Sequence, residues 1–354
     1  MADALAPDEL HLVRPDQLGP ALAEATGDGR WRSLRASLIA GGKSNLTFEV
    51  TSEAGVLILR RPPSGELLPS AHDMGREARV QQALAGTPVP VPRVLLVETS
   101  GDLLGVPFYV MEKVPGHIIR GELPAGYADT PQDRRALAHA LIDVLADLHA
   151  VDPEAVGLAG YGKPQGFLER QIRRWNGQWE KSKTHEVKAV EELGGRLAGM
   201  VPESQRSSIV HGDYRLDNCV MAPADPSRVN AVLDWELSTL GDPLTDLGLL
   251  LFYWREPGED QSALTPTVTQ NPGFPSRGDL AQRYAQRTGA RLDGLAFYEA
   301  FAHFKFAVIA QGVAARVAAG AMAGQDFGTP EQLDQEVLRI AEGGLSRLDQ
   351  EGQK

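Results

Sequence analysis

The 354-residue sequence contains a single cysteine, Cys219, and has no long uninterrupted run of apolar residues. One cysteine excludes a disulfide framework or a thiolate zinc site built within one chain. A membrane-spanning helix needs roughly 20 consecutive apolar residues, and no segment approaches that length. The N-terminal residues also lack the apolar core of a secretory signal. We therefore expect no membrane span and a cytoplasmic protein.

Positive charge is scarce as well. The chain has 35 Lys and Arg against 47 Asp and Glu, which gives a formal net charge of −12. An acidic chain is poorly suited to the phosphate backbone of nucleic acids, so we expect no nucleic-acid partner. Hydrophobic residues make up 42% and charged residues 23%, which is typical of a globular protein with a buried core.

The pattern of apolar residues changes near residue 115. Before that point, the β-rich stretches Leu46–Thr51 and Gly55–Arg60, a helical pattern over 72–86 and a buried strand at Phe108–Met111 indicate a strand-rich region. Beyond it, helical patterns predominate, beginning with the amphipathic stretch over 133–152, which Pro153 stops. We predict an α+β protein with two lobes.

The predicted lobes are a small N-terminal lobe over residues 1–114 and a larger, mostly helical C-terminal lobe over residues 115–354. The chain breaks between them at Pro115-Gly116, so we expect a hinge near Glu112–Gly116. Two lobes joined by a hinge favour a ligand cleft between them.

The stretch IAGGKSNLTFEV, residues 39–50, resembles the end of a nucleotide-binding P-loop. The P-loop pattern G-x-x-x-x-G-K-[ST] would need a glycine where the chain has Ser37, and a helix should follow. The β-prone LTFEV follows instead, so the P-loop interpretation fails. A glycine pair between two strands fits either an ordinary hairpin turn or the phosphate-covering loop of kinase-type folds.

The segment HGDYRLDN, His211 to Asn218, carries the strongest chemical signal. Phosphoryl transfer needs an acceptor for a hydroxyl proton, oxygen ligands for Mg²⁺ and positive charge on the phosphates. Asp213 and Asn218 have the spacing of the catalytic aspartate and the metal-binding asparagine of kinase catalytic loops. Asp234 then follows a short apolar strand, where a second metal ligand is expected. Each residue alone could be an ordinary loop or helix cap, but their order together predicts a phosphotransferase.

These motifs resemble the aminoglycoside phosphotransferase superfamily, which has a protein-kinase-like fold. The likeness is closer to the kinase-like domain at the N-terminus of acyl-CoA dehydrogenase family members 10 and 11. It rests on GGKSN, LRRPPSGELLPSAHDMGREARV, VPVPRVL, GVPFYVMEKVPG, YGKPQGFLERQIRRW and HGDYRLDN, and covers about Leu38 to Trp254. With the chain ending at Lys354, we expect no attached dehydrogenase.

The resemblance implies ATP and Mg²⁺ as cofactors and the hydroxyl of a small molecule as the phosphoryl acceptor. It implies that Asp213 is the catalytic base, that Asn218 and Asp234 bind the metal, and that Asp246 braces the catalytic loop. It places the nucleotide against the glycine loop, the third strand, the adjacent helix and the hinge, that is, against Gly41, Gly42, Ser44, Asn45, Arg60, Glu77, Glu112 and Val114.

One departure from the kinase pattern lies at the end of the third strand. Kinases have a lysine there, whereas this chain has Arg60 and Arg61. Alternation does not choose between them until the register of the strand is known. We favour Arg60, because it continues the strand before the RPP segment breaks it, and Glu77 is its expected partner. Arginine binds phosphate oxygens but is not equivalent to lysine.

The acceptor follows only from the resemblance, which favours a hydroxyacyl group, such as a hydroxyacyl-CoA. An anionic CoA ester would need a basic patch, for which Arg170, Arg173 and Arg174 are candidates, although they could equally form a solvated helix face. An aminoglycoside- or choline-type kinase and a non-catalytic protein that binds nucleotide or acyl-CoA are the alternatives. A protein kinase is disfavoured, because its His-Arg-Asp, Asp-Phe-Gly and Ala-Pro-Glu motifs are not matched. The sequence leaves a homodimer open.

Overall fold

The computed structural model describes residues 10–39, 45–63, 73–260, 262, 264–320 and 327–351. The chain divides into two compact units. The N-terminal unit comprises Met1–Gly116 and Asn230–Ser238, and the C-terminal unit comprises His117–Val229 and Thr239–Lys354. The prediction of an α+β protein with a smaller strand-rich part and a larger helical part is confirmed.

The division departs from the predicted lobes in one segment. Asn230–Ser238 belongs to the N-terminal unit, although the sequence pattern placed it within a continuous C-terminal lobe. Hydrogen bonds explain the difference, because the Val232 N–H donates to the Pro90 carbonyl at 2.8 Å and the Arg76 guanidinium donates to the Ser238 carbonyl at 3.1 Å. These contacts are distant in sequence and leave no local pattern.

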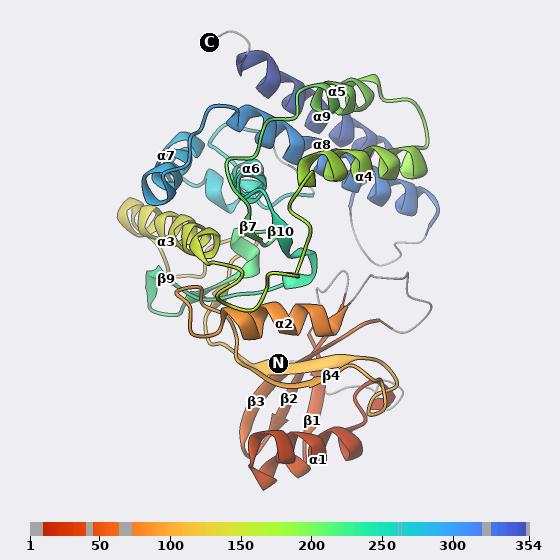
Figure 1. Ribbon diagram of the computed structural model, residues 1–354, viewed down its shortest axis with the longest axis vertical. Helices are drawn as coiled ribbons and strands as arrows, with labels where there is room; N and C mark the ends of the chain where they lie inside the picture. Colours follow the sequence, from red (N-terminus) through yellow and green to blue (C-terminus); the bar gives the residue numbers. More distant parts are fainter. Residues whose placement is uncertain are drawn as a thin grey trace. The chain divides into compact units, whose positions relative to one another are not determined.

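The N-terminal unit is built on a five-stranded antiparallel sheet with the strand order β1-β2-β3-β5-β4 (Figure 1). Its described elements are η1 (Leu10–Leu12), α1 (Pro15–Thr26), η2 (Gly29–Arg32), β1 (Arg35–Leu38), β2 (Leu46–Ser52), β3 (Gly55–Arg61), α2 (Met74–Leu84), β4 (Val94–Glu98), β5 (Phe108–Glu112) and η4 (Trp235–Leu237). A two-residue turn joins β2 to β3, with Ser52 paired to Gly55.

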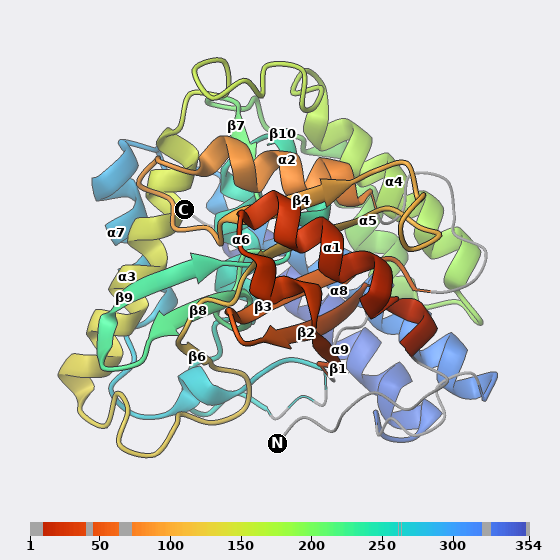
Figure 2. The ribbon, with the colours of Figure 1, turned by 90° about the horizontal axis from the view of Figure 1, so that it is seen from below.

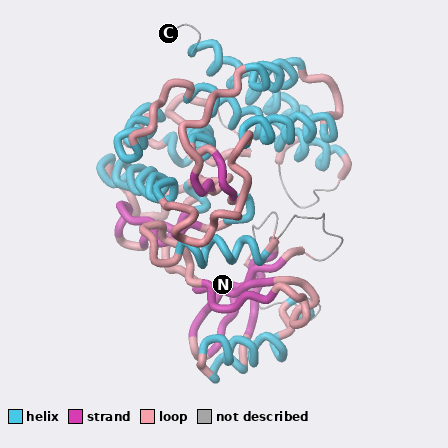
Figure 3. Tube along the Cα trace, viewed as in Figure 1, coloured by secondary structure: helices cyan, strands magenta, loops and turns pink. Residues whose placement is uncertain are grey.

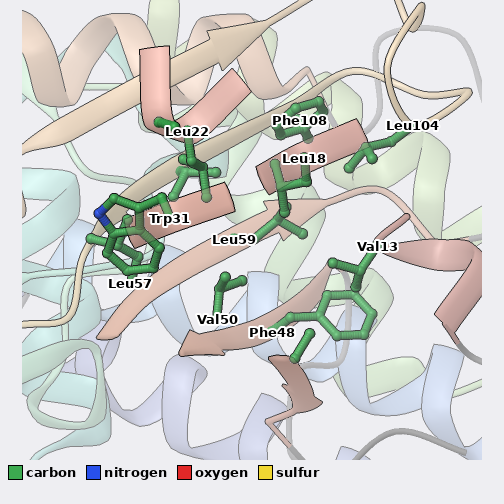
Figure 4. Packing of buried hydrophobic residues seen from close by; sticks show 13 residues of the cluster. Val13, Leu18, Leu22, Trp31, Phe48, Val50, Leu57, Leu59, Leu104 and Phe108 are labelled. Carbon is green, nitrogen blue, oxygen red and sulfur yellow. The ribbon is translucent and has the colours of Figure 1, made fainter. Parts of the chain in front are cut away.

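Helices cover both faces of this sheet. Leu18 and Leu22 of α1 pack against alternate residues of the strands on one face, among them Phe48, Leu59 and Phe108 (Figure 4). Figure 2 looks onto this face, with α1 lying across the strands. On the opposite face, α2 packs against the intervening residues Ile58, Tyr109 and Met111 through Met74 and Ala78. Alternation along the strands therefore decides which helix each strand residue meets.

The C-terminal unit is mostly helical (Figure 3). Its described elements are β6 (His117–Ile118), α3 (Pro131–Ala150), α4 (Phe167–Ser182), α5 (Lys188–Gly199), β7 (Ser208–Val210), η3 (Leu216–Asn218), β8 (Cys219–Ala222), β9 (Asp225–Val232), β10 (Thr239–Gly241), α6 (Leu244–Tyr253), η5 (Val268–Gln270), α7 (Arg277–Thr288), α8 (Leu295–Ala318) and α9 (Pro330–Glu351). The last residues of β9 carry the chain into the N-terminal unit.

Helix α3 shows how the sequence sets the helices of this unit. The Thr130 side chain caps the helix in a reciprocal capping box with Asp133, and Pro131 occupies the first turn. The predicted apolar face is buried, with Leu141 and Leu145 fully inaccessible. Helix α8 is buried on several sides and packs against α6, α4 and α9. Within the described residues, no helix is long and apolar enough to span a membrane.

Candidate active site

Strand β3 ends in two arginines whose side chains lie on opposite faces of the sheet. Leu57 and Leu59 pack on the α1 side, whereas Ile58 packs on the α2 side. Because side chains alternate along a strand, Arg60 lies on the α2 side and Arg61 on the α1 side. The register of β3 thus distinguishes the two arginines.

The contacts of the two arginines agree with this alternation. Arg61 donates to the carbonyl of Leu12 at 2.6 Å. Nη2 of Arg60 lies 3.1 Å from Oε1 of Glu77 and 3.0 Å from Oδ1 of Asp234. The expected pairing of Glu77 with a cation on β3 is therefore made by Arg60, and a role of that pair in nucleotide binding stays a prediction.

This ion pair is deeply buried within the N-terminal unit. The Glu77 side chain is fully inaccessible, and that of Arg60 is 11% exposed. Burial raises the pKa of Glu77, while the Arg60 guanidinium and the Tyr109 hydroxyl counter that rise. Burial also opposes the charge on Arg60, but the carboxylates of Glu77 and Asp234 outweigh it and raise the pKa of Arg60. Nε of Arg60 is buried and has no hydrogen-bond partner among the described residues.

Asp234 has an unusual backbone for a residue with a side chain. Its φ of 66° and ψ of 61° lie in the left-handed region, which aspartate tolerates better than most residues but which is still strained. Asp234 stands at the N-cap position of η4, yet its side chain makes no capping hydrogen bond. The carboxylate pairs with Arg60 and is 34% exposed. Asp234 is therefore not a simple helix cap.

Most of the predicted glycine loop lies outside the described residues, including Gly41, Gly42 and Ser44. Its last residue, Asn45, is 4% exposed and donates through Nδ2 to Oε2 of Glu236 at 3.0 Å. The side chain of Asn45 thus ties the end of the loop to the segment that carries Asp234. A direct contact of Asn45 with nucleotide stays a prediction.

The predicted hinge residues follow the end of β5. The Glu112 N–H donates to the Arg93 carbonyl at 2.9 Å, and the Glu112 carboxylate pairs with the Arg93 guanidinium at 2.8 Å. Val114 lies two residues beyond the strand and is half-buried. The chain leaves the N-terminal unit just after them, at Gly116.

In the C-terminal unit, the HGDYRLDN segment forms the loop that connects β7 to β8 and includes η3. Nδ2 of Asn218 donates to the carbonyl of Asp213 at 2.8 Å and to Oδ2 of Asp213 at 3.1 Å. Both partners are acceptors, so the amide nitrogen must face them and Oδ1 of Asn218 is turned away. The loop therefore presents a carboxylate beside an amide oxygen, both chemically suited to the roles predicted for them.

Asp246 of α6 fixes the start of this loop. Its carboxylate accepts from the backbone N–H of His211 at 2.6 Å and of Gly212 at 2.8 Å. Nε2 of His149 lies 3.2 Å from the same carboxylate, and Nδ1 of His149 lies 2.7 Å from the Tyr284 hydroxyl. Gly212 has a φ of 85°, which a residue with a side chain would adopt only with strain.

The titration properties of this buried pair follow from the same contacts. Burial alone would raise the pKa of Asp246, but hydrogen bonds from His149 and the loop N–H outweigh burial and lower it. Burial lowers the pKa of His149. Because a carboxylate only accepts hydrogen bonds, Nε2 of His149 donates to Asp246. The bracing role that the sequence suggested for Asp246 matches this geometry.

Two cations near the loop were not identified from the sequence. Nε of Arg215 lies 3.3 Å from Oδ2 of Asp213, and its Nη1 lies 3.0 Å from Oδ2 of Asp217. Nζ of Lys305 donates to the Gly212 carbonyl at 2.7 Å, and burial lowers the pKa of Lys305. Two sequence signals could have pointed to these residues. Arg215 lies inside the HGDYRLDN motif, and Lys305 is a single Lys within the mostly apolar stretch FAHFKFAV.

A pocket opens beside Arg215 in the C-terminal unit. The pocket is small, with a cavity volume of about 20 Å³, and Arg215 and Asp217 form its polar wall. The rest of the lining is mostly apolar and includes Leu250, Tyr253 and Trp254. The Arg215 guanidinium lies over the Tyr253 ring, with a distance of 4.8 Å to the ring centre. The pocket therefore adjoins the residue that contacts Asp213.

The model of the phosphotransferase enzyme family matches residues 35–301. The chain belongs to this phosphotransferase family. The match spans both the Arg60 cluster and the Asp213 loop, so it confirms the resemblance that the motifs predicted.

Named relatives of this phosphotransferase include acyl-CoA dehydrogenase family member 11 of Rattus norvegicus, 38% identical over 80% of this chain and 37% of the relative. Family member 10 of Mus musculus is 38% identical over 79% of this chain and 26% of the relative. This chain therefore spans 37% of the length of the first relative and 26% of the length of the second.

Solved structures confirm the kinase-like fold. A protein from Ralstonia eutropha, provisionally described as an aminoglycoside phosphotransferase, is 34% identical to this chain, with a TM-score of 0.76. The match covers 90% of this chain and 93% of the Ralstonia chain. The GDP complex of aminoglycoside 2'-phosphotransferase-IIIa has 16% identity and a TM-score of 0.59, with 97% and 99% covered, and shows the fold alone.

The donor set of the phosphotransferase fits Mg²⁺ rather than a soft metal. Within the described part of the chain, no group of three or more His, Cys, Asp or Glu side chains is arranged to hold a metal. The Mg²⁺ ion of a kinase needs fewer protein ligands. Water molecules and phosphate oxygens complete its coordination, so one amide and one carboxylate from the protein suffice. Asn218 carries an amide oxygen and Asp234 a carboxylate, and their role as metal ligands stays a prediction. Cys219 is buried, and burial raises its thiol pKa to about 12, which excludes a thiolate at neutral pH.

Proposed function

We propose that this protein transfers the γ-phosphoryl group of ATP to a hydroxyl of a small molecule. The observation that carries the proposal is the Asp213 loop, in which Asn218 and Arg215 hold the carboxylate and Asp246 braces the backbone. Family membership supports this reaction class, and the GDP complex of a protein of the same fold supports a nucleotide as donor.

In the proposed reaction, Asp213 accepts the proton of the acceptor hydroxyl, or orients that hydroxyl, as its oxygen forms a bond to the γ-phosphorus. The bond between the γ-phosphorus and its bridging oxygen breaks, and ADP leaves. Arg60, held by Glu77, binds phosphate oxygens. Asn218 and Asp234 hold Mg²⁺, which neutralises negative charge on the phosphates. Gly41, Gly42 and Ser44 cover the phosphates, and the backbone of Glu112 and Val114 meets the adenine.

For the acceptor, we propose a hydroxyacyl compound, such as a hydroxyacyl-CoA. One observation supports it: the relatives are named as members of the acyl-CoA dehydrogenase family. Arg173 and Arg174 of α4 are exposed and offer positive charge to an anionic ester, whereas Arg170 donates to the backbone carbonyls of Lys163 and Gln165.

The test is ADP release from Mg-ATP with hydroxyacyl-CoAs, aminoglycosides and choline as acceptors. Asp213→Ala should nearly abolish transfer and leave ATP affinity within a few-fold. Asp293→Ala, which removes a carboxylate whose side chain is 86% exposed, is the matched control and should keep full activity. Unchanged turnover in Asp213→Ala would refute the assignment of the base.

The panel also separates the alternatives. ADP release with only aminoglycosides or choline would replace the hydroxyacyl acceptor by an antibiotic- or choline-type substrate. ATP binding without ADP release for any acceptor would favour a non-catalytic nucleotide-binding protein. A cytoplasmic location and a homodimer stay predictions, which cell fractionation and light scattering would check.

A further inference from the structure

Tyr109 on β5 is a buried polar residue that the proposed reaction does not use. Its backbone is paired directly with that of Arg60 on β3, and the side chain is fully inaccessible. It lies on the α2 face of the sheet together with Ile58 and Met111. Phenylalanine would fill the same apolar space, so the hydroxyl group needs a separate explanation.

That hydroxyl is the middle of a directional chain of hydrogen bonds. Nε2 of Gln81 donates to the Tyr109 oxygen at 3.0 Å, and the Tyr109 hydroxyl donates to Oε1 of Glu77 at 2.9 Å. A phenol has a single hydrogen, so accepting from Gln81 commits that hydrogen to Glu77. Nε2 of Gln81 also lies 3.4 Å from the carbonyl of Glu77, one turn earlier in α2, which fixes the direction of the amide.

This series of hydrogen bonds ends at the oxygen that Arg60 also contacts. Oε1 of Glu77 meets both the Tyr109 hydroxyl and Nη2 of Arg60. Two donors on one oxygen restrain the rotation of the carboxylate. The carboxylate, together with Oδ1 of Asp234, in turn restrains the position of Nη2 of Arg60. The long side chain of arginine needs such restraint, because its donors lie in a rigid plane that must be aimed as a whole.

We propose that Tyr109 is a positioning residue that acts through Glu77 to hold the Arg60 guanidinium in its phosphate-binding orientation. This inference rests on the proposed function, in which Arg60 binds the phosphates of ATP. Tyr109 touches neither nucleotide nor metal in this scheme. Its contribution passes entirely through the Glu77 carboxylate.

The experiment uses the full chain and the variant Tyr109→Phe, which keeps the ring and removes the hydroxyl. Tyr127→Phe is the matched control, because the Tyr127 ring is also buried but its hydroxyl has no hydrogen-bond partner in the part of the chain that the structure describes. Calorimetry measures the affinity for Mg-ATP. The NMR signal of the Arg60 Nε–H group, assigned by its loss in Arg60→Lys, measures the orientation of the guanidinium without nucleotide.

We expect Tyr109→Phe to weaken Mg-ATP binding by about ten-fold, the size of a typical coupling within one hydrogen-bond network. It should also shift the Arg60 signal, whereas Tyr127→Phe should change neither. In an Arg60→Met background, adding Tyr109→Phe should weaken binding no further. A merely structural role would lower the melting temperature equally in both backgrounds and leave affinity unchanged.

Two results would overturn the inference: an unshifted Arg60 signal in Tyr109→Phe, or an equal loss of affinity with and without Arg60. If the wild-type protein binds no Mg-ATP, the proposed function fails. The Arg60 signal then still decides whether Tyr109 sets the orientation of the guanidinium.

Discussion

Replacing Asp246 with asparagine should destabilise the C-terminal unit and loosen the catalytic loop. The carboxylate is completely buried. Oδ2 accepts from the His211 N–H and faces Nε2 of His149, while Oδ1 accepts from the Gly212 N–H. Asparagine has the same shape but only one acceptor oxygen, so its amino group must point at one of these donors.

The least costly arrangement places the amino group toward Gly212 and leaves one buried N–H without a partner. Losing a hydrogen bond to a charged group costs about 1.5–3 kcal/mol. The two bonds that remain also lose their charge assistance, so we expect a total of about 3 kcal/mol. For a unit of this size, that corresponds to a decrease in melting temperature of roughly 6–12 °C.

The assay is urea denaturation of the wild type and Asp246→Asn at neutral pH, with Asp147→Asn as the matched control. Asp147 forms a partly exposed pair with Arg287 at 2.8 Å, and such pairs contribute about 1 kcal/mol at most. We expect a large decrease in the free energy of unfolding for Asp246→Asn and a small one for Asp147→Asn. Equal values for the two variants would refute the bracing role.

The pH dependence gives an independent check. The folded pKa of Asp246 is lowered, so its stabilisation is present above the unfolded pKa, about 3.9, and is lost as pH falls through the lower folded value. The stability difference between wild type and Asp246→Asn should therefore be constant above about pH 5 and shrink below about pH 4. A difference that grows with acidification would contradict this account.

Three further predictions concern other parts of the chain. Arg60→Leu should weaken Mg-ATP binding strongly but still measurably in calorimetry, whereas Arg61→Leu, on the opposite face of the sheet, should keep the wild-type affinity at a temperature where the variant is folded. Gly248→Ala should lower the melting temperature by more than about 5 °C. The added Cβ would lie 2.5 Å from the carbonyl oxygen of Tyr298, and overpacking of this kind costs about 1–3 kcal/mol or more. An unchanged melting temperature would refute the close approach of α6 and α8. Burial lowers the pKa of His303 to about 4, so its neutral form stabilises the fold above about pH 6.5 and this stabilisation is lost toward pH 4. His303→Gln should therefore flatten the stability profile between those pH values, and an unchanged profile would exclude His303 as the titrating group.

The sequence was sufficient where local chemistry decides the structure. The five-residue spacing of Asp213 and Asn218, the apolar face of α3 and the strands on either side of the catalytic loop all depend on residues close together in the chain. The choice between Arg60 and Arg61 needed one further fact, the register of β3. That register is set by pairing with β2 and β5.

The remaining features depend on contacts between distant residues. Tyr109 matters because β5 pairs with β3 and α2 packs on that face, and neither relation is visible in a residue pattern. Asn45 reaches Glu236 across 191 positions of sequence. Lys305 reaches the carbonyl of Gly212 from a helix that begins more than 80 residues later. Such pairings require the fold itself.

The membership of Asn230–Ser238 in the N-terminal unit has a consequence for synthesis of the protein. Translation releases most of that unit first, but the residues that complete it emerge only after the whole intervening segment His117–Val229. During this interval Arg60 is without Asp234 and Asn45 is without Glu236. An isolated fragment ending at Gly116 would stay in that incomplete state, so the N-terminal unit cannot be obtained whole by truncation. A nascent chain finishes its first unit only while it is already building its second.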